Sequence, residues 1–321
     1  MFFTLHDRFL NHETLVGVSW TQYSLKCAAV KKLSNGGYRL VKCHEVTLTE
    51  KTVDADGKIL EQEHFSDALT QLFREAKLKK QKKVGFCVPS SSCTTKQIEF
   101  NADAGEAEIL QQLMYNCERH LSYPYEEIYM DYQLLTPDLS RNTRSVALVA
   151  THRDNVELAI QSFEAAGLDP EALIPDGMVL QRFMSLFYPF DITGNETYLI
   201  LGLYDESYAL HIMTENETLF MDEKRLGVAY EQEDFLSVML PWLSRNMQMF
   251  GLDYDRPIKR VLVYGDRQDL LELEPHITEF IEEPVEMLDL AKLVSGTSSA
   301  LSKQQRSRFL FAVSSATWEV L

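Results

Sequence analysis

The feature that most constrains the fold is a pattern of three short strands that occurs twice in the chain. Residues 15–49 show the apolar alternation of three consecutive strands separated by tight polar turns. Residues 197–227 repeat this plan, and laying Val18 on Leu201 superposes the apolar positions of the first hairpin. Helical segments follow each copy. The repeat therefore predicts two lobes of a duplicated α/β fold, each opening on a three-stranded antiparallel meander.

Composition limits the functions that such a fold can have. The chain has 321 residues, enough for two cores, and carries a formal net charge of −17 with a pI near 4.9. Nucleic-acid binding relies on lysine and arginine side chains that neutralise phosphates, so we expect no nucleic-acid partner. No apolar run is long enough for a membrane span, and the N-terminus lacks a basic region followed by a cleavable apolar segment. We expect a soluble cytoplasmic protein.

The sequence carries no signature of metal-dependent or covalent catalysis. It has no HExxH, GxSxG or CxxC motif, and its eight histidines and five cysteines are scattered along the chain. We therefore predict no catalytic residue and no metal ligand.

The stretch between the two repeats has its own order of elements. A buried strand ends at Pro89 and leads through a serine turn into a further strand and an amphipathic helix. Two paired strands follow at 126–135 and 143–152. A helix then begins near Arg153, with Gly167 as its stop signal.

Three segments of this middle region resemble one protein family. They are VGFCVPSSSCTTKQIEF, EAEILQQLMYNCERHLSYPYEEIYMDYQLL and VALVATHRDNVELAIQSFEAAGLDPEALIPDGMVLQRF. The duplicated meander resembles the actin and FtsA superfamily, and together these features make the chain similar to PilM, the cytoplasmic actin-like component of type IV pilus assembly platforms. Divergent branches of that family, the MSHA-pilus MshI proteins and the competence PilM proteins, fit equally well. The likeness runs from about Leu15 to the final helix.

The resemblance implies an FtsA-like architecture of two ribonuclease H-like lobes. The first lobe is expected to span residues 1–190, interrupted by a small inserted α/β subdomain at about 84–150. The second lobe is expected to span residues 191–321.

The resemblance also implies a partner and a cellular location. PilM-like proteins bind the short cytoplasmic N-terminal tail of PilN, a single-span inner-membrane protein, and so lie peripheral to the inner membrane as scaffolds for pilus motor and platform proteins. A homo-oligomer is a further expectation. By resemblance, the groove for the tail lies between the first lobe and the inserted subdomain. Its candidate walls are a strand and a helix carrying Phe86, Val88, Pro89, Leu113, Cys117 and His120.

The first phosphate loop of the family is altered in this sequence. The family pattern, roughly Gly-Leu-Asp-Ile-Gly-Ser-Ser-Ser-Val-Lys, starts here at Gly17, but Ser19 stands at the aspartate position and Thr21 at the loop glycine. Ser24 and Lys26 keep the family's residue types. A phosphate loop needs glycine for close backbone approach and a carboxylate near Mg²⁺, and this loop supplies neither. Without the rest of the loop, we expect Lys26 to be a solvated strand lysine.

The second phosphate loop and the adenosine loop are altered in the same way. The family's Asp-Ile-Gly is replaced by a run from Gly202 to Tyr204, so the carboxylate is absent and the tyrosine ring would project toward the phosphates. The Gly-Gly pair of the adenosine loop is half retained, at Gly265. Asp205 and Asp266 could replace the lost carboxylate only from displaced positions. We predict a pseudo-ATPase scaffold with no bound cofactor.

Two alternatives remain open. An active actin-fold ATPase of the same system would bind ATP with Mg²⁺. A domain similar to the cytoplasmic part of the type II secretion protein GspL would share the fold, but such proteins normally continue into a transmembrane segment, and this sequence ends at Leu321 without one.

Overall fold

The chain forms two compact units, each with its own five-stranded sheet. The computed structural model describes residues 14–317 except 35, 90–91, 122, 135–141, 191–195, 227–230, 255 and 297–301. The first unit consists of three segments: the chain up to Val30, Lys42–Asp176, and the chain from Ser315 onward. The second unit consists of Lys31–Val41 and Gly177–Ser314. Among the described residues, no helix combines the length and apolar character needed to cross a membrane.

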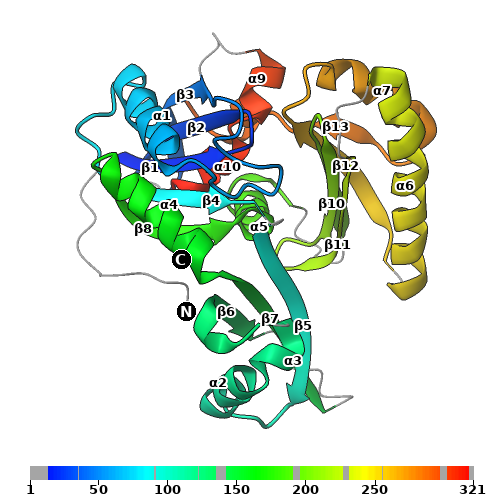
Figure 1. The fold of residues 1–321 in the computed structure, drawn as a ribbon. Helices are drawn as coiled ribbons and strands as arrows, with labels where there is room; N and C mark the ends of the chain where they lie inside the picture. Colours follow the sequence, from blue (N-terminus) through cyan, green and yellow to red (C-terminus); the bar gives the residue numbers. More distant parts are fainter. Residues whose placement is uncertain are drawn as a thin grey trace. The chain divides into compact units, whose positions relative to one another are not determined.

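The first unit is built on a five-stranded sheet and two helices that connect its strands. These elements are β1 (Thr14–Trp20), β2 (Ser24–Lys32), β3 (Tyr38–Thr47), β4 (Lys83–Val88), β8 (Asp169–Pro175), α1 (Gln62–Glu75) and α4 (Arg153–Ala165). The strand order is β3-β2-β1-β4-β8, with β1, β4 and β8 parallel. Parallel neighbours need crossover connections, and α1 leads into β4 while α4 leads into β8. Figure 1 shows both helices along this sheet, where they pack against each other.

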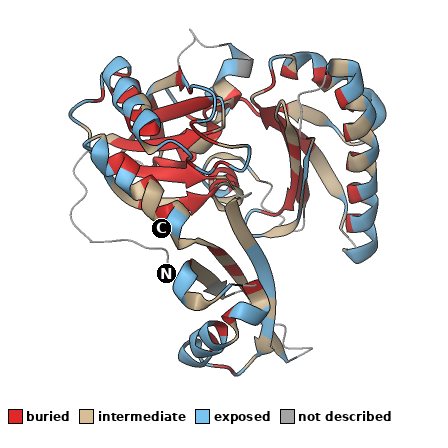
Figure 2. Ribbon diagram, in the orientation of Figure 1, coloured by how far each residue is buried: buried red, intermediate tan, exposed pale blue. Residues whose placement is uncertain are grey.

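The sequence pattern explains why these elements form the core of the first unit. β1 is buried from Leu15 to Trp20, as expected of a parallel strand that is covered on both faces. The apolar residues of α1 recur on one side of the helix, and Phe65, Leu69 and Leu72 are all fully buried. Figure 2 shows buried and exposed positions alternating along this helix. The predicted end of α4 is confirmed, because Gly167 follows the helix with a φ of +75° that favours glycine.

The second unit repeats the topology of the first. Its strands are β9 (Thr197–Leu203), β10 (Ser207–Met213), β11 (Thr218–Arg225), β12 (Ile258–Gly265) and β13 (Val285–Met287), in the order β11-β10-β9-β12-β13. Val18 of β1 pairs with Phe86 of β4, and Leu201 of β9 pairs in the same parallel manner with Val263 of β12. The internal repeat predicted from the sequence is therefore confirmed by strand order and register.

Several helices lie wholly or mainly in the second unit. They are α5 (Asp176–Phe187), α6 (Gln232–Asp253), α7 (Leu270–Phe280), α8 (Leu290–Leu293), α9 (Lys303–Ser307) and α10 (Leu310–Ser315). Residues Phe235, Met239 and Leu243 of α6 and Leu273 and Ile277 of α7 are fully buried against the sheet. The apolar residues of both helices recur at the three- and four-residue spacing of one helix face.

A separate three-stranded sheet lies within the first unit, between β4 and α4 in the chain. It has the order β5-β7-β6, formed by β5 (Cys93–Asn101), β6 (Ile128–Leu134) and β7 (Thr143–His152), and α2 (Glu106–Tyr115) and α3 (Cys117–Leu121) pack on it. The predicted subdomain began at Val84, but residues 84–88 form β4 of the five-stranded sheet, so the three-stranded sheet begins only at Cys93. The predicted boundary between the lobes at 190/191 adjoins residues 191–195, which lie outside the described residues.

Candidate functional site

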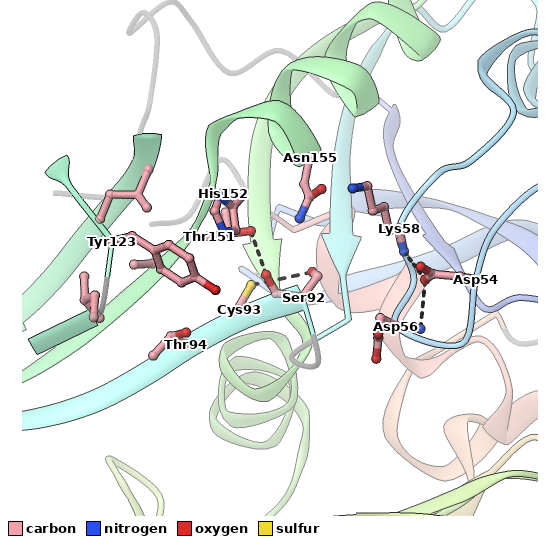
Figure 3. Close-up of a pocket in the computed structure, with 13 residues that line it drawn as sticks. Asp54, Asp56, Lys58, Ser92, Cys93, Thr94, Tyr123, Thr151, His152 and Asn155 are labelled. Carbon is pink, nitrogen blue, oxygen red and sulfur yellow. Dashed lines mark hydrogen bonds between the residues drawn. The ribbon is translucent and has the colours of Figure 1, made fainter. Parts of the chain in front are cut away.

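A pocket of about 220 Å³ lies in the first unit, where the three-stranded sheet meets a short hairpin that follows β3. We call residues 53–59 the Asp54 hairpin. Figure 3 shows Asp54, Asp56 and Lys58 on one side of the pocket and Thr94 and Tyr123 on the other. The remaining wall comes from the ends of α3, β6 and β7 and from the start of α4, with Ser92, Cys93, Leu121, Ile128, Ala150, Thr151, His152 and Asn155.

The Asp54 hairpin is ordered by its own hydrogen bonds. Val53 and Ile59 pair as an isolated antiparallel bridge. Within the loop, one carboxylate oxygen of Asp54 accepts hydrogen bonds from the backbone N–H groups of Asp56 and Lys58, each at 2.9 Å. A side chain that accepts from nearby backbone groups stabilises a tight turn. The hairpin therefore presents its side chains to the pocket from a defined backbone.

Two contacts hold the tip of the Asp54 hairpin from outside. The indole Nε1–H of Trp20, at the end of β1, donates a hydrogen bond to the carbonyl oxygen of Gly57 at 2.9 Å. Gly57 has a φ of +78°, and a Cβ atom there would lie 2.3 Å from Cγ of Pro89. Only glycine fits this position, because both the backbone conformation and the close approach of Pro89 exclude a side chain.

The opposite wall of the pocket contains both polar and apolar residues. The hydroxyl of Thr151 donates to the carbonyl oxygen of Ser92 at 2.7 Å, which joins β7 to the start of β5. The rings of Tyr123 and His152 meet edge to face with centroids 4.2 Å apart. Burial raises the pKa of the Cys93 thiol to about 12, so this cysteine is a neutral, unreactive wall residue. The pocket is suited to binding and holds no activated nucleophile among the described residues.

The structure places the six predicted partner-binding residues mostly in cores. Phe86, Leu113 and Cys117 are at most 2% exposed. Phe86 belongs to the core of the first sheet, and the other two belong to the core under α2 and α3. A fully buried side chain offers no surface to a peptide.

Of the other three predicted partner-binding residues, one is buried and two are half-buried. Val88 is buried at the end of β4, and Pro89 is half-buried and packs against Gly57. His120 is half-buried one residue before the pocket residue Leu121, and burial lowers the pKa of its imidazole. None of the six lines the pocket, although the chain segments that carry Pro89 and His120 lead directly into its walls.

The turn between β1 and β2 is closed by its own side chains. The hydroxyl oxygen of Thr21 accepts hydrogen bonds from the backbone N–H groups of Tyr23 and Ser24, each at 3.3 Å. Ser19 and Ser24 are buried, at 6% exposed each. A phosphate loop directs free N–H groups at its ligand, whereas this turn directs two of them at its own threonine.

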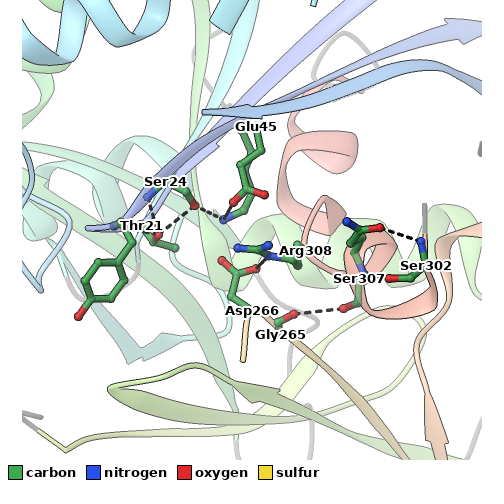
Figure 4. A network of polar contacts seen from close by, with 11 residues as sticks. Thr21, Ser24, Glu45, Gly265, Asp266, Ser302, Ser307 and Arg308 are labelled. Carbon is green, nitrogen blue, oxygen red and sulfur yellow. Dashed lines mark hydrogen bonds and ion pairs between the residues drawn. The ribbon is translucent and has the colours of Figure 1, made fainter. Parts of the chain in front are cut away.

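Lys26 differs from the prediction that it would be a solvated lysine. It is 2% exposed, its ammonium donates to the Ser24 hydroxyl at 2.8 Å, and it lies 3.7 Å from a carboxylate oxygen of Glu45 (Figure 4). The prediction was wrong because β3 brings Glu45 to this lysine, a contact between residues far apart in the sequence. A buried ammonium needs such a partner.

In the second unit, the glycines at the predicted loops have packing roles. A Cβ atom on Gly202 would lie 2.8 Å from the hydroxyl of Tyr264, and one on Gly265 would lie 1.9 Å from the carbonyl oxygen of Leu203. Tyr204 stands in the β9–β10 turn, where its N–H donates to the carbonyl of Ser207 at 2.9 Å. Its ring is edge-on to Tyr264, with centroids 6.3 Å apart. Close contact between neighbouring strands explains why glycine stands at these two positions.

Polar side chains from the C-terminal helices contact the end of β12. The hydroxyl of Ser307 donates to the carbonyl oxygen of Gly265 at 3.1 Å, and Arg308 donates to Asp266 at 3.3 Å (Figure 4).

Burial raises the pKa of the Asp205 carboxyl. Across the described residues, no three His, Cys, Asp or Glu side chains lie close enough together to hold a metal ion.

Comparison with known proteins gives one family and several structures of the same fold. Residues 17–239 match the family model described as type IV pilus assembly protein PilM. The chain is similar to a solved PilM-PilN type IV pilus biogenesis complex, with a TM-score of 0.80, 16% identity, and coverage of 97% of this chain and 100% of that chain. It is also similar to the ethanolamine utilization protein EutJ from Carboxydothermus hydrogenoformans, with a TM-score of 0.50, 8% identity, and coverage of 96% and 90%.

These likenesses show the fold. The match to the PilM structure spans almost the whole of both chains. The predicted actin-like α/β fold is confirmed.

Proposed function

This chain belongs to the type IV pilus assembly protein PilM family, and from that premise we propose that it is a cytoplasmic scaffold that binds the N-terminal tail of a PilN-like inner-membrane protein. Binding the tail would hold the scaffold at the inner face of the membrane. Other platform proteins and further copies of this chain would then assemble on it.

The observation that carries this proposal is the pocket beside the Asp54 hairpin. Its volume of about 220 Å³ is below the roughly 300–1,000 Å³ of sites for whole small-molecule ligands, so it suits one or two side chains of a longer peptide. Leu121, Ile128 and Ala150 supply apolar contact, and the two carboxylates of Asp54 and Asp56 outnumber the ammonium of Lys58, which leaves net negative charge at the hairpin side. An extended peptide with an apolar anchor and a basic neighbour is complementary to this arrangement.

We further propose that the protein does not hydrolyse ATP. Three observations support this: the β1–β2 turn satisfies its own N–H groups, Glu45 pairs with Lys26, and Arg308 pairs with Asp266. Each places an internal partner on a group that a nucleotide or its metal ion would otherwise need. An active ATPase of the same system is the alternative, and nucleotide titration distinguishes the two.

The test of tail binding is calorimetric titration with a synthetic peptide that copies the N-terminal segment of the PilN-like protein of the same organism. Tyr123→Ala removes a half-exposed ring from the pocket wall and should weaken binding by about tenfold or more, in the range of an aromatic interface anchor. Tyr115→Ala is the matched control, because Tyr115 is 89% exposed on α2 and does not line the pocket. Equal affinities for the two variants would contradict the assignment of the pocket.

A further inference from the structure

We infer that Trp20 is a positioning residue for partner binding, because it holds the Asp54 hairpin in the place from which that hairpin faces the pocket. The inference rests on the proposed function and adds a role for the end of β1. That strand end aligns with the first phosphate loop of the family, and here it carries an indole that supports the peptide site.

The Trp20 ring is fixed in the core of the first unit. It is 5% exposed, meets the ring of Phe65 edge to face at 5.3 Å, and stacks on Phe86 at 5.9 Å. Phe163 completes the cluster at 6.4 Å. Tryptophan has one side-chain N–H and no acceptor, so a ring held on several sides donates in one fixed direction. That donor points to the Asp54 hairpin.

The acceptor is the carbonyl of Gly57, which lies between two residues of the pocket wall. The hydrogen bond measures 2.9 Å and is buried. Asp56 precedes Gly57 and Lys58 follows it, and both line the pocket. A change in the position of Gly57 therefore moves both side chains. Because Asp56, Gly57 and Lys58 are consecutive, the hydrogen bond from the indole fixes the position of the two pocket side chains as well as the conformation of the loop.

Pro89 holds the other side of the same glycine. A Cβ atom at Gly57 would approach Cγ of Pro89 to 2.3 Å, so the backbone of the hairpin lies directly on the proline ring. Pro89 directly follows β4, the strand that pairs in parallel with β1. The hairpin tip is thus held from the C-terminal ends of two adjacent strands, Trp20 acting by hydrogen bond and Pro89 by contact.

The first experiment uses Trp20→Phe in the full chain. Phenylalanine keeps a ring in the aromatic cluster but removes the N–H donor and leaves the Gly57 carbonyl without this partner. We expect the affinity for the PilN-like tail peptide to fall about tenfold, the effect of one buried hydrogen bond lost from a preorganised site. We also expect faster amide hydrogen exchange at residues 54–58, measured without peptide. Replacing Trp20 with β-(3-benzothienyl)alanine, which has sulfur in place of the N–H at nearly constant shape, should give both effects.

Phe163→Leu is the matched control. It damages the same aromatic cluster, in which Phe163 stacks on Phe86 at 4.7 Å, but Phe163 does not line the pocket. We expect it to lower the melting temperature while leaving affinity and exchange at 54–58 unchanged. Equal losses of affinity in both variants would make Trp20 merely structural and overturn the inference. If the wild-type chain does not bind the peptide, the proposed function fails, and unchanged exchange in Trp20→Phe would separately overturn the link between Trp20 and the hairpin.

Discussion

A carboxylate oxygen of Glu45 lies 3.7 Å from the ammonium of Lys26, and the lysine is buried. The sequence resemblance aligns Lys26 with the phosphate-loop lysine of the family, and in the structure the charge of this lysine faces an anion from β3. The Ser24 hydroxyl accepts from the same ammonium at 2.8 Å. In this protein the loop lysine therefore contributes to the stability of the first sheet.

The ion pair gives a prediction about stability. Glu45→Gln should lower the free energy of unfolding by about 2 kcal/mol, because the buried ammonium of Lys26 loses its charged partner. Urea unfolding followed by circular dichroism measures the change. Lys292→Gln is the control: Lys292 pairs with Glu286 but is 62% exposed, and its loss should cost less than about 1 kcal/mol. Equal effects would contradict a stabilising role for the buried pair.

Nucleotide binding gives the second prediction. Calorimetric titration of the wild-type chain with Mg-ATP should show no micromolar affinity, because the loops lack the carboxylate and the bare glycine backbone that the metal ion and phosphates need. The positive control is a variant that carries Ser19→Asp and Thr21→Gly together with Glu45→Gln, which frees Lys26 from its anion. A micromolar dissociation constant for the wild type would favour the active ATPase.

His211 gives a prediction about pH. It lies buried on β10, and among the described residues its Nδ1 atom has no hydrogen-bond partner. Burial lowers the pKa of this imidazole from 6.5 to about 4. Between these two values the unfolded chain binds a proton that the folded chain does not, so stability is full above pH 6.5 and falls as the pH drops toward 4.

The total loss assigned to His211 is roughly 3 kcal/mol, and it should be absent in His211→Leu. Urea unfolding at several pH values between 4 and 7.5 measures the slope for both proteins. His276→Gln changes an exposed histidine of α7 and should keep the wild-type slope. If His211→Leu also keeps that slope, another group causes the pH dependence.

Two glycines give opposite predictions for the same substitution. Gly265→Ala should destabilise the second unit by several kcal/mol, since its Cβ atom would lie 1.9 Å from the carbonyl oxygen of Leu203 at a φ of +145°. Gly251→Ala in α6 meets no atom within 4 Å and should raise the free energy of unfolding by about 0.5–1 kcal/mol, the helix preference of alanine over glycine. Thermal unfolding of both variants measures these changes. An unchanged stability of Gly265→Ala would contradict the prediction and show that the two strands can separate at this position.

Several parts of the site were not predictable from the local sequence pattern. The polar composition of residues Thr52 to Glu63 indicates a connecting loop, and the Asp-Gly pair at 56 and 57 indicates a hairpin turn within it. Neither feature shows that this loop lines a pocket. Nothing local indicates that Trp20 hydrogen-bonds to residue 57 or that Glu45 reaches Lys26. These contacts join residues that are 37 and 19 positions apart in the chain.

The sequence by itself determined the duplicated meander, the stripe of α1 and the end of α4, because periodicity and stop signals are local properties. Only the tertiary structure decided that Asp169–Pro175 forms β8, since a strand that contains two prolines is acceptable only at the edge of a sheet. It likewise decided that Phe86 and Leu113 are core residues and that Asp54 and Tyr123 line a pocket. Burial and pocket walls depend on which distant segments pack together, and no local pattern records that.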